Sequence, residues 1–174
     1  MSEKANFSNI YTFYDLINTV LTFGFDKSWR EKAVSNLIGK SVLDLGSGTG
    51  AAYEQLLNFE TTAIDPDKKM LELNAFDNKV LGTAENLPFQ DNSFDNVFCS
   101  FVWRNVSDTN IALNEVYRVL RPGGRFILLD MTRPKNSFLR MLHKIGTFKV
   151  LHLIGLITFN LKEYRFLYKS LDFY

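Results

Sequence analysis

The stretch SVLDLGSGTG, Ser41 to Gly50, decides the fold of this chain. Its first half, SVLDL, is a short apolar run typical of a buried strand. Its second half holds three glycines in five residues, and glycine allows backbone angles closed to other residues and close approach of a ligand to the main chain. A helix is expected next, over residues 51–58. A strand, a glycine turn and a helix in this order predict the start of an α/β domain.

The same alternation continues along the chain. We expect further strands at 61–65, 79–81, 94–100 and 125–131, helices after Pro66 and over 109–120, and a turn at 122–124 before the last strand. Short apolar strands that alternate with helices predict a Rossmann-like, doubly wound and mostly parallel sheet covered on both faces. The chain stops before the two strands that usually end such a sheet. Strand 125–131 is therefore expected at an open edge, which a tail beyond residue 174 or, alternatively, a partner chain or helix would cover.

Helical segments are expected on both sides of this core. Apolar residues from Phe7 to Ile17 recur every three or four positions, which predicts an N-terminal amphipathic helix. A second helix is expected to start after Asp26, whose side chain would cap the first turn, and to end at Gly39. We therefore divide the chain into a helical lid segment, 1–40, a core, 41–134, and a C-terminal helical cover, 135–174, within one structural domain.

Composition excludes several classes of function. The 20 Lys and Arg against 19 Asp and Glu leave a net charge of +1, so the basic face that binds a phosphate backbone is missing and no nucleic acid partner is expected. The lone Cys99 makes no internal disulfide, and the N-terminus lacks the apolar stretch of a secretory signal. The most apolar run, 150–161, is shorter than the roughly 18 residues that span a bilayer. A cytoplasmic protein without a transmembrane segment is expected.

A carboxylate follows the glycine turn at a spacing that is typical of a nucleoside-binding edge. Asp65 lies 21 residues after Asp44, at the end of the second predicted strand, where a carboxylate can accept from both hydroxyls of a ribose. These residues predict a nucleoside-binding edge. They leave the cofactor open, because Gly46, Gly48 and Ala51 also satisfy the dinucleotide pattern G-x-G-x-x-G/A, and a tight turn without a ligand also fits.

Later motifs narrow the choice of cofactor. The segments TAENLPF at 83–89, DNSFD at 91–95 and RVLRPGG at 118–124 resemble the successive motifs of class I S-adenosylmethionine-dependent methyltransferases. Within that class, SFVWRNVSD at 100–108 and LLDMTRP at 128–134 resemble the ubiquinone/menaquinone-biosynthesis C-methyltransferase family, as do residues 14–29 and 163–174. The resemblance covers nearly the whole chain and implies S-adenosylmethionine as cofactor and S-adenosylhomocysteine as product.

The resemblance also implies a set of cofactor-binding residues. Thr49 and the glycines would lie along the methionine part, Asp65 would bind the ribose, Thr83 and Ala84 would meet the adenine, and Ser100 would lie beside the sulfonium. The full set is Asp44, Gly46, Ser47, Gly48, Thr49, Gly50, Asp65, Pro66, Met70, Thr83, Ala84, Glu85 and Ser100. No metal is expected, because the methyl group of a sulfonium is already activated.

The acceptor implied by the resemblance is a small lipophilic ring, a demethylmenaquinol or ubiquinol type. Methylation at a ring carbon requires loss of a phenolic proton, and Arg104 and Asn105 could stabilise the resulting phenolate. Tyr14 is a further catalytic candidate. The alternatives are a structural salt bridge for Arg104 and plain packing for Tyr14. Peripheral contact with a membrane and a homodimer are both compatible with this acceptor.

Three departures from the family pattern bear on the site. Val102 and Trp103 stand where the family usually has glycine and leucine, which predicts a bulkier acceptor wall, and Ala51 replaces a usual acidic residue. Three rival functions stay open at this point: methylation at oxygen or nitrogen of another small metabolite, binding of S-adenosylmethionine without catalysis, and an NAD-dependent reductase.

Overall fold

The computed structural model describes residues 19, 21–22, 24–157 and 161–172. The helix predicted over 7–17 and the catalytic candidate Tyr14 lie outside the described residues. The described residues fall into two compact units, one of 22–130 and one of 131–172 together with Thr19 and Leu21. The first unit holds the sheet and also the helix that starts at Asp26, which the sequence analysis grouped with a lid segment.

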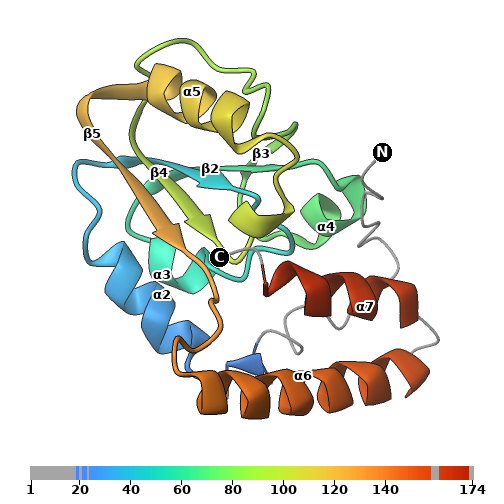
Figure 1. Ribbon diagram of the computed structural model, residues 1–174. Coiled ribbons are helices and arrows are strands. Elements are labelled where there is room, and N and C mark those ends of the chain that lie inside the picture. Colours follow the sequence, from blue (N-terminus) through green and yellow to red (C-terminus); the bar gives the residue numbers. More distant parts are fainter. Residues whose placement is uncertain (1–18, 20, 23, 158–160, 173–174) are drawn as a thin grey trace. The chain divides into compact units, whose positions relative to one another are not determined.

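The first unit is built on a five-stranded parallel sheet (Figure 1). Its strands are β1 (Ser41–Leu45), β2 (Glu60–Asp65), β3 (Asn78–Leu81), β4 (Phe94–Ser100) and β5 (Leu120–Leu129), in the order β3-β2-β1-β4-β5. The predicted Rossmann-like α/β fold is confirmed. Because all strands are parallel, the carboxyl ends of β1, β2 and β4 meet at one edge, the edge where ligands of such sheets bind.

Helices cover both faces of the sheet. Alternate residues of β1 point to opposite faces, so Leu43 and Leu45 pack under α5 (Thr109–Val119), whereas Val42 packs under α3 (Tyr53–Leu56). Buried residues on the α5 face include Ile64, Val97, Cys99, Ala112, Val116 and Val119. Those on the other face include Ala52, Leu56, Ala63, Phe76 and Phe98, with Ala33 and Val34 of α2 (Asp26–Val34) packed against them.

Two helix boundaries differ from the prediction. Helix α2 does start at Asp26, but its side chain does not cap the helix: Oδ1 accepts from Thr22 and Oδ2 pairs with Arg30. The helix ends at Val34, five residues before Gly39, because the segment that follows is hydrogen-bonded to the start of β4. Helix α3 is shorter than the predicted 51–58. Helix α4 (Lys68–Leu73) follows Pro66 as expected and is capped by Asp67.

The last strand begins earlier than predicted. Residues 122–124 do not separate α5 from the strand, because β5 already pairs Leu120 with Phe94 and resumes at Arg125 opposite Asn96. The extra residues form a bulge in which Gly123 has a φ of +82°. The predicted turn is therefore an irregularity within β5.

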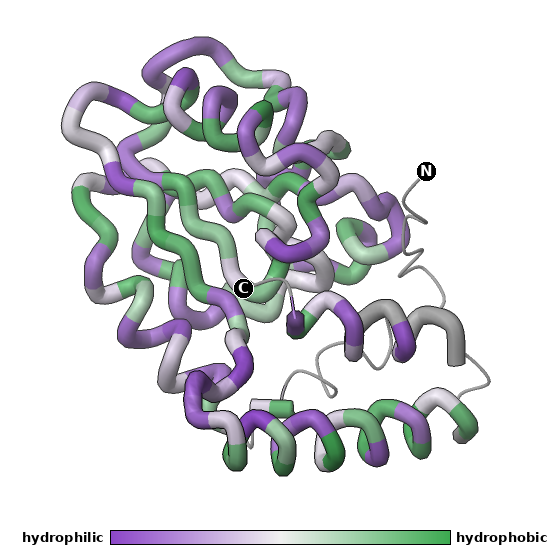
Figure 2. The backbone as a smooth tube through the Cα atoms, in the orientation of Figure 1, coloured by the Kyte–Doolittle hydropathy of each residue, from purple (hydrophilic) through white to green (hydrophobic). Residues whose placement is uncertain are grey.

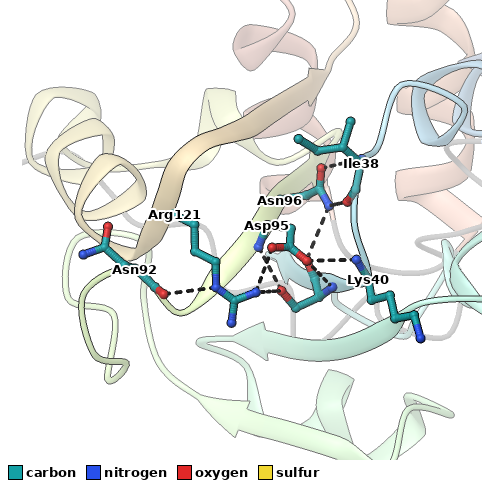
Figure 3. A network of polar contacts seen from close by, with 7 residues as sticks. Ile38, Lys40, Asn92, Asp95, Asn96 and Arg121 are labelled. Atoms are coloured by element: carbon teal, nitrogen blue, oxygen red, sulfur yellow. Dashed lines mark hydrogen bonds and ion pairs between the residues drawn. The ribbon is translucent and has the colours of Figure 1, made fainter.

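A polar network lies beside this bulge, at the start of β1 and β4 (Figure 3). One oxygen of Asp95 accepts from the backbone N–H groups of Lys40 and Ser41, at 2.8 and 3.0 Å, and the other pairs with Arg121 at 2.7 Å. The Asn96 side chain bonds both main-chain groups of Ile38. The network ties the segment after α2 to the amino-terminal edge of the sheet, opposite the edge expected to bind ligand.

The second unit contains the helices α6 (Ser137–Ile157) and α7 (Leu161–Ser170). Leu151 of α6 and Tyr164 of α7 are buried against each other. Arg133 pairs with Asp172 at 2.6 Å and lies over the ring of Tyr168. Apolar and polar residues alternate along α6 (Figure 2). Several of the apolar ones are exposed: Phe138, Leu139, Met141, Leu142, Ile145, Phe148, Leu153 and Leu156. Within the described residues, none of the helices has the length and apolarity to cross a membrane.

Candidate cofactor and acceptor site

The glycine turn after β1 is fixed by hydrogen bonds to β2. The N–H groups of Gly46 and Ser47 both donate to the carbonyl of Ile64, at 2.9 and 3.0 Å. One residue further, the N–H of Gly48 donates to Oδ2 of Asp65 at 2.9 Å. The turn and the acidic end of β2 thus form one hydrogen-bonded edge.

Each glycine of the turn has a positive φ, +71° at Gly46, +52° at Gly48 and +86° at Gly50. A side chain at Gly46 would collide with the γ-carbons of Val102, and one at Gly50 would come within 2.8 Å of Oδ1 of Asn74. At Gly48 a Cβ would meet only the sulfur of Met70, at 3.6 Å. Packing therefore requires glycine at two positions, and the third leaves its main chain open to a ligand.

Asn74 is a site residue that the sequence analysis missed. Its Nδ2 donates to Oγ of Ser47 at 3.2 Å and to the carbonyl of Gly48 at 3.0 Å, while its Oδ1 accepts from the N–H of Phe76. The side chain is buried. A buried asparagine just after α4 holds the turn in shape, and the only signal in the sequence was a polar residue inside an apolar run.

Two buried carboxylates lie at this edge. Asp44 is 2% exposed, and its Oδ2 has no hydrogen-bond partner among the described residues. Burial, with a smaller effect of the Asp65 charge, raises the pKa of Asp44 to about 7. Burial also raises the pKa of Asp65 to about 6, although the N–H groups of Asp67 and Gly48 oppose the shift. An acceptor oxygen that is buried and unpartnered suits a ligand that brings its own donor.

The segment after β3 is less open. Thr83 forms an isolated bridge with Asn86 and is exposed, and Ala84 packs against the core under α5. Pro66, directly after β2, is also exposed. The carboxylate of Glu85 accepts from the N–H groups of Ser107 and Asp108, at 2.8 and 3.3 Å. Glu85 thereby connects the loop after β3 to the loop after β4, a structural contact that the sequence analysis did not anticipate.

The acceptor side was expected just past β4. Ser100 ends the strand half-buried, and Phe101 is buried with a φ of +61°. Trp103 was expected in the wall of the acceptor site, and whether it lines that site stays a prediction. It is buried in the core, 5.2 Å from the ring of Phe126. Val102 packs over Gly46.

Arg104 and Asn105 follow in a short 3-10 helix, η2 (Trp103–Asn105). The guanidinium of Arg104 pairs with Asp130, just past β5, and the side chains are only 1% and 4% exposed. This is the salt bridge considered from the sequence as the alternative to a catalytic role. The Oδ1 atom of Asn105 is buried and has no hydrogen-bond partner among the described residues.

A parallel sheet of this order, with a glycine turn after β1 and an acidic end of β2, is a Rossmann-like nucleoside-binding domain, a kind that the S-adenosylmethionine-dependent methyltransferases share. The profile of the ubiE/COQ5 methyltransferase family matches residues 3–174. The chain belongs to this family, which implies S-adenosylmethionine as its cofactor and excludes the NAD-dependent reductase considered above.

Individual relatives agree with this assignment. The ubiquinone/menaquinone biosynthesis C-methyltransferase UbiE of Rickettsia bellii is 36% identical over 97% of this chain and 76% of its own length. A possible histamine N-methyltransferase of Thermotoga maritima has a similar structure, with a TM-score of 0.61 and 27% identity over 83% of this chain and 70% of its own. A putative methyltransferase of Methanococcus maripaludis shares the fold, with a TM-score of 0.65 and 24% identity over 94% of this chain and 80% of its own.

Proposed function

We propose that this enzyme methylates a ring carbon of a demethylmenaquinol or ubiquinol type acceptor and releases S-adenosylhomocysteine. The observation that carries the proposal is the 36% identity, over nearly the whole chain, to a relative named as a ubiquinone/menaquinone C-methyltransferase. The segment 100–108 at the carboxyl end of β4, where the acceptor would meet the methyl group, resembles the same family.

The residues at the sheet edge fit the cofactor. Asp65 has lone pairs left for the ribose hydroxyls after its two backbone bonds, and the open main chain of Gly48 leaves room beside Met70. The unpartnered oxygen of Asp44 suits the ammonium group of the methionine part. Ser47, Thr49, Gly50 and Pro66 would border the methionine and ribose, Thr83, Ala84 and Glu85 the adenine, and Ser100 the sulfonium.

The cofactor supplies an electrophilic methyl group, so the protein has to orient the acceptor and manage its proton. We assign the orientation of the acceptor hydroxyl to Asn105, whose Oδ1 can accept its hydrogen bond until the phenolic proton leaves to solvent. Arg104 contributes a positive charge whose field is partly neutralised by Asp130, and the pair fixes the loop that carries Asn105. Tyr14 stays a candidate from the sequence alone.

The direct test is a single-turnover assay with methyl-labelled S-adenosylmethionine and a demethylmenaquinone that has been chemically reduced to its quinol. Label should appear on the ring carbon, and Asn105→Ala should lower the rate by about 100-fold through misplacement of the acceptor, while S-adenosylhomocysteine still binds. Label on oxygen, or on a catechol or amine offered in parallel but not on the quinol, would replace the proposed acceptor. Cofactor binding without any transfer would indicate a binding protein.

The cofactor site has its own test. Calorimetry with S-adenosylhomocysteine should show that Asp65→Ala costs about 1.5 to 3 kcal/mol of binding free energy, because charge-assisted bonds to the ribose are lost. The exposed Asp77, substituted by alanine, serves as the matched control and should bind like the wild type. Equal affinity in both variants would remove Asp65 from the site.

A further inference from the structure

Arg30 is a buried cation that the cofactor residues above do not include. It lies in α2 and is 4% exposed. Its Nη1 donates to Oδ2 of Asp26 at 2.7 Å, and the other oxygen of Asp26 accepts from the hydroxyl of Thr22. A buried guanidinium is stable only when its charge is compensated, and this ion pair one helical turn away provides the compensation.

The position of Arg30 is set by the residue after β4. Its guanidinium carbon lies 5.1 Å from the centre of the Phe101 ring. Phe101 is itself fixed, because its N–H donates to the carbonyl of Leu129 at 2.7 Å and its φ is +61°, a region where a side chain of this size is rarely found. Arg30 therefore lies at the carboxyl end of β4, against the ring of the residue that follows Ser100.

That edge also carries Asp44, because β1 and β4 are neighbours with Asp44 opposite Phe98. Arg30 and Asp44 each bury an atom without a hydrogen-bond partner among the described residues, Nε of the arginine and Oδ2 of the aspartate. The two side chains are within electrostatic range, since the charge of Arg30 lowers the pKa of Asp44 against the effect of burial. A buried donor and a buried acceptor of opposite charge thus stand unsatisfied at one edge of the sheet.

We propose that Arg30 binds the carboxylate of the amino-acid end of S-adenosylmethionine, while Asp44 holds the ammonium on the same carbon. The inference rests on the proposed cofactor site. Because Nη1 of Arg30 is bound to Asp26, the Nε edge is the one left for a ligand, and a guanidinium edge matches a carboxylate well. An α-amino acid presents both charges on neighbouring groups, so the pair selects this end of the molecule and no other part of it.

Calorimetry with three ligands tests the assignment. S-adenosylhomocysteine carries both charges, decarboxylated S-adenosylmethionine lacks the carboxylate, and methylthioadenosine lacks the whole amino-acid end. Arg30→Met should weaken S-adenosylhomocysteine by about 30-fold or more and leave the decarboxylated ligand within about twofold of the wild type. Lys32→Met, at an exposed position of the same helix, should leave all three affinities unchanged.

Because Arg30→Met leaves Asp26 unpaired, Asp26→Asn/Arg30→Met is measured beside it, and thermal unfolding reports whether each variant folds. A parallel loss for all three ligands would make Arg30 a structural residue and overturn the inference. The inference would also be overturned if the wild type bound decarboxylated S-adenosylmethionine as tightly as S-adenosylhomocysteine, which has the carboxylate. If the wild type binds none of the three, the proposed cofactor site has failed instead.

Discussion

At the residue scale, Asp44 makes the folded protein sensitive to pH. Burial raises its pKa from the usual 3.8 to about 7, so the folded state holds a proton more tightly than the unfolded chain does. The stability from this proton is fully present below about pH 4 and is lost as pH rises through about 7. Asp44→Asn should therefore raise the free energy of unfolding at pH 8, by up to about 4 kcal/mol, and flatten its dependence on pH.

Denaturant unfolding at several pH values measures this effect, with Asp77→Asn as the exposed control. In Asp44→Asn the free energy of unfolding should still depend on pH, less steeply and with the same sign, because the pKa of Asp65 is raised to about 6. If Asp44→Asn were less stable than the wild type at pH 8, the charge of Asp44 would have to be compensated by other groups in the protein without cofactor. In the wild type, cofactor binding at pH 6.5 should release protons, because the bound ammonium favours the charged carboxylate.

The Arg104–Asp130 pair leads to a second prediction at this scale. Arg104→Ala leaves the Asp130 charge buried and should lower the free energy of unfolding by about 3 to 5 kcal/mol. Removing both charges in Arg104→Met/Asp130→Leu should restore much of the loss. Thermal unfolding and single-turnover rate are measured on the same preparation. A stable Arg104→Ala protein that binds S-adenosylhomocysteine but turns over about 100-fold more slowly would instead give Arg104 a direct part in the chemistry.

Gly46 and Val102 should be coupled. Gly46→Ala adds a Cβ into the Val102 side chain at a positive φ, and we expect a loss of about 2 to 4 kcal/mol. Val102→Gly removes the collision, so the double variant should be more stable than the sum of the single losses implies. Strict additivity in denaturant unfolding would mean that the backbone strain alone accounts for the cost at Gly46.

At the element scale, the network around Asp95 holds β1, β4 and the bulge of β5 together (Figure 3). Backbone donors at Ser41 and the Arg121 guanidinium hold the pKa of Asp95 well below its usual range. Its contribution to stability is present above about pH 4 and is lost as pH falls further. Asp95→Ala should cost about 2 to 4 kcal/mol near neutral pH, measured by denaturant unfolding.

The matched control for Asp95 is Asp91, which lies four residues earlier, in the loop before β4, and is also paired with an arginine. Its carboxylate bonds Arg118 at 2.9 Å but is 67% exposed. Asp91→Ala should cost no more than about 1 kcal/mol, as expected for a surface pair. Similar losses in the two variants would mean that the backbone donors add little to the Asp95 network.

The boundaries of the elements show what the sequence could and could not predict. Apolar runs placed β1 and β4 correctly, because a buried parallel strand needs little besides its own residues to be recognised. Contacts from distant residues changed the other ends. Asn96 and Asp95, more than fifty residues away, end α2 early, and pairing with Phe94 draws residues 120–124 into β5.

The same distinction applies to the candidate site. The glycine turn and Asp65 were predicted from spacing, and the structure brings them into hydrogen-bond contact. Arg30 and Asn74 were missed because their importance depends on what they meet in space, Phe101 for one and Ser47 for the other. The pairing of Arg104 with Asp130 could be weighed only as an alternative, since the sequence places both at strand ends without giving the direction of either side chain.

At the scale of the whole molecule, the strand order governs how the protein can be made. Strands β2 and β3 pair within about twenty residues of β1 and β2 respectively, whereas β4 pairs with β1 across more than fifty. During synthesis, β1, β2 and β3 therefore emerge from the ribosome first. The face of these strands that carries Leu43 and Ile64 stays uncovered until α5 has been synthesised. Nascent chains that end before residue 119 should be degraded readily by protease, and resistance should arise in one step once β5 has joined the sheet.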